Sequence, residues 1–252
     1  MRGMVFKMNK IQKETKEYVI YSPDSLNYLT NEMYNILNNS IKFYKELFGI
    51  KQFRKIQINY FDNINDFRNF IYNLRGEKDS LPDYAKGTFD NGMINAFIEP
   101  NLIINSLLYN KKLYLSSHEL FHIMYQELIL KKENKSRVVW FDEGMAQFFS
   151  CECHEELSDK NFCEWFKLLI NNTKEIPNLN DLNHRTGFET ENYSGYKLSL
   201  LAVKYLYETL PLLEFKKLMH NPDEIITYGA TVLNDAINYY NVKYNKINYK
   251  KK

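Results

Sequence analysis

The chain has 252 residues, of which 44% are apolar and 25% are charged, and its formal net charge is +2. This balance is ordinary for a soluble globular protein and gives no indication of nucleic acid as a partner. No run approaches the ~20 apolar residues of a membrane span, and the first residues lack the roughly 7–15 apolar residues of a secretory signal. We therefore expect no membrane partner and a cytoplasmic location.

The first part of the chain alternates between strand and helix patterns. Apolar residues recur at helical spacing from Leu26 to Leu47 and stop before Gly49, which is a natural helix end. The dipeptide Asn91–Gly92 tolerates the positive φ angles of a tight hairpin turn. These patterns predict strands at 16–22 and 54–61, helices at 26–48 and 65–74, and a hairpin at 87–100.

From Leu107 onward the sequence reads as nearly all helix. We expect helices at about 111–131, 141–156, 160–172, 190–209, 211–219 and 222–238. The prediction is a single α+β domain over residues 16–240, with a sheet subdomain at 16–110 and a helical subdomain at 111–240. Residues 1–15 are expected to be a tail, and residues 241–252 a basic tail. The two subdomains are expected to meet at a cleft.

The segment SSHELFHIMYQEL holds the pattern His-Glu-x-x-His. On a helix, positions i and i+4 share one face, so His118 and His122 can direct their rings to a single point. Neutral imidazole is a good zinc ligand. Glu119 lies about 100 degrees around the helix, too far round to be a third ligand but close enough to reach a water on the metal.

A catalytic zinc site needs three protein ligands and one open position. Glu143 follows His122 after enough residues to finish one helix and bring a second one alongside. It stands among large apolar residues, where a carboxylate without a partner would be costly to bury. Gly144 and Ala146 are small enough to let the two helices approach closely. We therefore predict Glu143 as the third ligand.

The motif HELFH followed by WFDEGMAQFF resembles the gluzincin metallopeptidases, in particular their small peptidase-MA-like domains. The likeness includes the YVIYSPDS segment, the G-T-F hairpin and the late YSGYKLSLLAVKYL helix, and it covers about residues 16–240. It implies a zincin-like fold, with the helix of the first motif between the two subdomains. The two-part motif is specific, and the flanking likeness is looser.

The resemblance implies a zinc-dependent metallopeptidase that acts on a peptide or protein substrate. Carried over residue by residue, His118, His122 and Glu143 hold one Zn²⁺. Glu119 takes a proton from the attacking water and later delivers one to the leaving amine. The sequence has no G-x-M-E-N-like segment of the kind that holds a free N-terminus, which favours an endopeptidase.

Relatives in this family use a tyrosine of the late helix to stabilise the oxyanion, and the matching position here is Tyr196. Tyr193 and His184 are the alternative donors. Asp142 and Gln147 are candidates to accept a hydrogen bond from a zinc-bound imidazole, although a solvated helix residue is an equally good interpretation of each. The strand within GMINAFIEP is expected to form the sheet edge where an extended substrate pairs.

Two other interpretations remain open. The protein can be a catalytically idle zincin that serves as a binding or regulatory module, or a zinc hydrolase of a non-peptide amide or ester. Cys151, Cys153, His154 and Cys163 do not have a common zinc-binding spacing. We interpret the three cysteines as ordinary free thiols.

Overall fold

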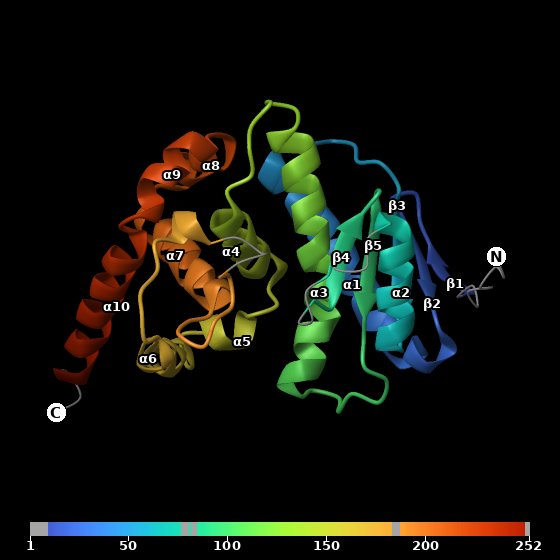
Figure 1. The fold of residues 1–252 in the computed structure, drawn as a ribbon, viewed down its shortest axis with the longest axis horizontal. Helices are drawn as coiled ribbons and strands as arrows, with labels where there is room; N and C mark the ends of the chain where they lie inside the picture. Colours follow the sequence, from blue (N-terminus) through green and yellow to red (C-terminus); the bar gives the residue numbers. More distant parts are fainter. Residues whose placement is uncertain (1–9, 77–80, 82–84, 183–186, 250–252) are drawn as a thin grey trace. The chain divides into compact units, whose positions relative to one another are not determined.

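The structure is a computed structural model that describes residues 10–76, 81, 85–182 and 187–249. The protein is α+β: a five-stranded mixed sheet precedes a series of helices (Figure 1). The chain forms two compact units, Met1–Ile123 and Met124–Lys252. The expected α+β class is thus confirmed.

The sheet belongs to the first unit, and its strand order is β1-β2-β3-β5-β4. Strands β2, β3 and β5 pair in parallel, whereas β1 and β4 pair antiparallel with their neighbours at the two edges. Alternating burial in β2 follows the apolar alternation of the sequence, whereas in β3 the polar Asn59 is buried as well. The strands are β1 (Lys10–Glu14), β2 (Tyr18–Ser22), β3 (Ile56–Phe61), β4 (Gly87–Asp90) and β5 (Met93–Phe97).

The two faces of this sheet carry different helices. The Tyr18 ring packs edge-on against Tyr34 of helix α1 (Asn27–Phe48). On the opposite face, Phe97 joins Phe67 of helix α2 (Ile64–Arg75) in an apolar cluster. Figure 1 shows α2 in front of the strands. Helix α3 (Leu107–Tyr125) follows the hairpin and contains the His-Glu-x-x-His pattern.

Two turns in this unit depend on left-handed backbone. Gly49 has φ 67° and ends α1, as its sequence position predicts. Asn91 and Gly92 have φ 47° and 82°, and they connect β4 to β5. Positive φ at both central residues is the signature of a tight hairpin turn, so the predicted hairpin is confirmed.

The second unit is helical over its described residues. Helices α4 and α7 pack closely, because Gly144 has no side chain and the Ser199 carbonyl approaches it directly. Helices α7 and α10 also pack against each other. The helices are α4 (Val139–Ser150), α5 (His154–Leu157), α6 (Phe162–Asn172), α7 (Gly195–Thr209), α8 (Leu212–His220), α9 (Pro222–Gly229) and α10 (Val232–Tyr249).

Several elements differ from the sequence-based expectations. Strand β1 lies within the stretch that was expected to be a tail. Most of its residues are exposed, and its sequence therefore shows no alternation of apolar and polar residues that would predict a strand. Helix α7 begins at Gly195 because Ser194 caps it. The single helix expected at 222–238 is interrupted after Gly229, and α10 extends to Tyr249 through the expected C-terminal tail.

The expected edge strand is wrong. Strand β5 pairs with both β3 and β4, so β4 forms the edge of the sheet. The second strand of the hairpin, β5, lies in the interior of the sheet because it also pairs in parallel with β3. Gly144 lies against α7, where the Ser199 carbonyl is the nearest neighbour of the position that a Cβ would occupy. Within the described residues, no helix combines the length and apolar character needed to cross a membrane.

Candidate metal centre

The two histidines of α3 lie one helical turn apart and face each other. The distance between the His118 Nε2 and His122 Nε2 atoms is 3.0 Å, and the ring centroids are 4.7 Å apart. Both side chains are buried. The i, i+4 spacing therefore brings two imidazole nitrogens to one point, as the sequence predicts.

Hydroxyl groups hold α3 in place just before His118. The Ser116 and Tyr60 hydroxyls share a hydrogen bond of 2.7 Å, which connects α3 to β3. The Ser117 hydroxyl lies 2.9 Å from the Tyr44 hydroxyl and 2.7 Å from that of Ser40, both on α1. Two adjacent serines thus fix the helix against both the sheet and α1.

Glu119 is buried on the same turn as His118. Its Oε1 atom lies against Gly87, in the edge strand β4. A carboxylate one residue after a ligand is in the position that the sequence predicts for a proton-transfer group.

Glu143 of α4 belongs to a buried charged cluster. Arg137 donates from Nη2 to Glu143 Oε1 at 2.6 Å and from Nε to Asp142 Oδ2. Gln126 donates to the same Asp142 oxygen at 2.9 Å. Burial opposes the charge of Arg137, but the two carboxylates outweigh that effect and raise the pKa of the guanidinium above its usual value.

The two residues expected as imidazole acceptors, Asp142 and Gln147, also contact other groups, and their role toward an imidazole stays a prediction. Asp142 is fully buried and pairs with Arg137 and Gln126, so a solvated Asp142 is excluded. Gln147 is also buried, and its amide donates to the main-chain oxygens of Glu143 and Tyr196 at 3.2 and 3.0 Å. Gln147 thus connects the Glu143 turn of α4 to the start of α7.

The predicted ligand set comes together. One ligand atom each from His118, His122 and Glu143 lies within 4.8 Å of the others, and all three residues are buried. Two imidazole nitrogens and one carboxylate oxygen form a donor set that suits a divalent transition metal, with zinc a good match. These residues can therefore hold one metal ion.

The oxyanion-donor candidates stay predictions. Tyr196 lies in the first turn of α7, where its ring packs edge-on against Phe188 at 4.7 Å. The Tyr193 hydroxyl donates to the Gly187 carbonyl at 2.9 Å, which gives it a structural partner. His184 lies outside the described residues.

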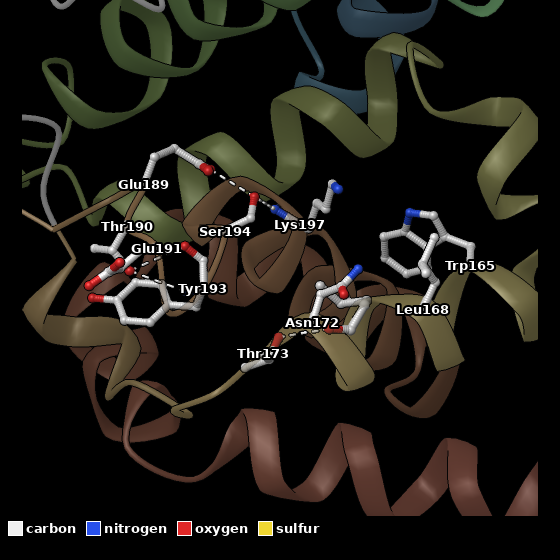
Figure 2. A pocket seen from close by; sticks show the side chains of 11 residues that line it. Trp165, Leu168, Asn172, Thr173, Glu189, Thr190, Glu191, Tyr193, Ser194 and Lys197 are labelled. Atoms are coloured by element: carbon white, nitrogen blue, oxygen red, sulfur yellow. Dashed lines mark hydrogen bonds between the residues drawn. The ribbon is translucent and has the colours of Figure 1, made fainter.

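A separate pocket of about 200 Å³ lies in the second unit, between α6 and the start of α7. Figure 2 shows Trp165 on one side of it and Glu189 and Ser194 on the other. The Ser194 hydroxyl donates to Glu189 Oε1 at 2.8 Å, and the same oxygen accepts the Tyr196 N–H at 3.2 Å. These polar groups cap α7, and no lining residue among those described is a predicted metal ligand.

The three cysteines are free, as predicted: Cys151 is exposed, Cys153 buried and Cys163 intermediate. Within the part of the chain that the structure describes, the His118, His122 and Glu143 group is the one identified as able to hold a metal.

Sequence reasoning missed Arg137, Gln126 and Gly87. Each matters because of a contact that the spacing of residues in the sequence does not reveal. Arg137 and Gln126 both bond to Asp142, and Gly87 lies against helix α3. The only available signal was the pair of acidic residues at 142 and 143, which needs a nearby cation if both are buried. In comparisons with known proteins, no family model matches the chain and no curated protein matches it.

Proposed function

We propose that this protein is a zinc-dependent metallopeptidase with a zincin-like fold, of the gluzincin type, and that it acts as an endopeptidase. The observation that carries the proposal is the convergence of His118, His122 and Glu143 within 4.8 Å. Two histidines and one glutamate are the protein ligands of a well-known class of catalytic zinc site, which keeps a fourth position open. Glu119 supplies the additional carboxylate that hydrolysis requires.

The chain's own residues divide the chemistry between them. His118, His122 and Glu143 would hold the metal, which when bound lowers the pKa of a water molecule toward 7 and polarises the substrate carbonyl. Glu119 accepts the proton of the attacking water and returns a proton to the leaving amine nitrogen. Tyr196 is the proposed donor to the oxygen that gains negative charge.

Arg137 supports this assignment through the third ligand. Its Nη2 atom donates to Glu143 Oε1, and its Nε atom donates to Asp142 Oδ2. One guanidinium thus bridges two neighbouring carboxylates, and its planar fork restrains them better than a flexible ammonium would. The arrangement would hold the Glu143 carboxylate in place before the metal arrives.

The test combines metal analysis with cleavage of a mixed peptide library. Zinc-loaded wild type and Glu119→Gln are compared by metal content and by mass-spectrometric mapping of the cuts. We expect one zinc in each protein, and internal cuts by the wild type only. Because glutamine cannot take the proton, the variant should lose turnover and keep the metal.

Three other results would change the assignment. A wild type that binds no zinc would contradict the metal site. Full cleavage by Glu119→Gln would contradict the role of that carboxylate. Zinc bound without cleavage of any peptide would favour an idle binding module, or a hydrolase of another amide.

A further inference from the structure

Gly87 lies where α3 passes over the edge strand β4. A Cβ atom added at Gly87 would lie 2.5 Å from Glu119 Oε1, and 3.0 Å from a methyl group of Leu115. Leu115 and Glu119 are one helical turn apart on α3. The contact is therefore between one face of the helix and one backbone position of the sheet.

Gly87 cannot retreat from this contact. It is held in the β4–β5 ladder opposite Ala96, and the neighbouring Lys86 carbonyl accepts a hydrogen bond of 2.7 Å from the Phe97 N–H. Strand β5 is in turn paired with β3 along its length. Any side chain at residue 87 would therefore displace the glutamate and leave the strand where it is.

The backbone of Gly87 does not itself require glycine. Its φ lies outside the left-handed region, unlike those of Gly49, Gly76, Gly92 and Gly187. An L-amino acid can adopt this extended conformation without strain. The reason for glycine at this position is consequently space, and the neighbour closest to that space is the Glu119 carboxylate.

We infer that Gly87 is a positioning residue, whose missing side chain sets where the Glu119 carboxylate lies. This inference rests on the proposed function, in which Glu119 transfers protons. An alanine would push Oε1 away by roughly 1 Å to restore an ordinary contact, and a misplacement of that size costs about 10²-fold in rate. The atom that moves is the end of a flexible side chain, so folding is little affected while turnover falls.

The experiment compares Gly87→Ala with wild type, and repeats the substitution in the Glu119→Asp background. Aspartate is one methylene shorter and withdraws the carboxylate from residue 87. We expect Gly87→Ala to lower kcat by about 10²-fold in the glutamate background and by less than about 10-fold in the aspartate background. Zinc affinity should stay within about twofold of wild type in every variant, because the ligands are not displaced.

Melting temperature gives a readout that does not depend on turnover. Gly87→Ala should lower it more in wild type than in the Glu119→Ala background, because only the contact with Leu115 remains once the carboxylate is gone. Equal shifts in both backgrounds, or an unchanged kcat, would overturn the inference. A wild type without turnover would count against the proposed peptidase alone, since the melting temperatures would still report the contact.

Discussion

Next to His118, helix α3 is held by neutral hydroxyl groups, whereas next to Glu143, helix α4 is held by charges. The α3 contacts are the Ser116–Tyr60 and Ser117–Tyr44 pairs. The α4 contacts are those of Arg137 with Asp142 and Glu143. Loss of one hydroxyl leaves a single uncharged hydroxyl without its hydrogen-bond partner. Loss of Arg137 leaves two buried carboxylates without their positive charge. The charged region should therefore be the more sensitive to substitution.

The largest expected effect tests whether both regions serve one metal. Zinc at 1,000 times its Kd should stabilise the folded protein by about 4 kcal/mol. His122→Ala and Glu143→Ala should each remove most of this gain, because each deletes one of three ligands. Thermal unfolding with zinc and with a chelator measures the difference. His220→Ala is the control, since His220 is exposed and pairs with Glu133; an equal loss there would contradict a specific site.

Arg137→Ala should produce the next largest effect. Removing the guanidinium from two buried carboxylates should lower the free energy of unfolding by about 3 kcal/mol. Urea denaturation of the metal-free protein measures this value. Arg75→Ala is a matched control, because Arg75 has a similar exposure and its partner Asp90 is less deeply buried than Asp142. If the free energy of unfolding falls by the same amount in both variants, the two adjacent carboxylates of α4 do not make that region more sensitive to substitution.

Tyr60→Phe tests the hydroxyl contacts that hold α3. It should lower the free energy of unfolding by about 1 kcal/mol at pH 7, because the hydrogen bond to Ser116 is lost. Burial raises the pKa of Tyr60 above its ordinary value of 10.0. The contribution of this hydroxyl is therefore complete below pH 10 and is lost as the pH rises toward the higher folded-state pKa. The gap between variant and wild type should narrow above pH 10, as followed by urea denaturation.

The control for this comparison is Tyr207→Phe. Tyr207 is partly exposed, and its ring contacts with Phe148 and Phe215 persist in the variant. Its stability difference from wild type should be small at pH 7. A Tyr60→Phe gap that stays constant to pH 11 would contradict the buried hydroxyl pair.

The smallest expected effect concerns Glu208, a charged residue of α7 that is exposed. Glu208 accepts hydrogen bonds from Lys204 at 2.6 Å and Lys243 at 3.0 Å. Burial raises the pKa of Glu208, but the two lysines outweigh it and hold the pKa below its usual 4.5. Glu208→Gln should cost at most about 1 kcal/mol at pH 7.

This contribution is present above pH 4.5 and lost as the pH falls through the lower folded-state pKa. The difference between Glu208→Gln and wild type should therefore disappear in acid, as measured by thermal unfolding from pH 7 to pH 3. A cost as large as that of Arg137→Ala would show that charge alone, without deep burial, explains the sensitivity of α4.

The predictable parts of the molecule are those that depend on local spacing. The His118–His122 pair follows from helical geometry alone, and the hairpin follows from Asn91–Gly92. Glu143 was predictable because an acidic residue among large apolar ones needs a partner. Strand β1 was not, because its pairing with β2 leaves most of its residues exposed and no apolar period to detect. Arg137 and Gly87 matter through side chains distant in sequence or in another element, which a local pattern does not show.

The parallel pairing of β2, β3 and β5 also has a kinetic consequence. Parallel strands cannot be joined by a tight turn, so β2 and β3 must wait for α1 to form between them, and β3 and β5 for α2 and β4. Because folding slows as contacts become more distant in sequence, we expect the surroundings of α3 to be completed only after these strands have paired. The ability to bind metal should therefore appear late in folding.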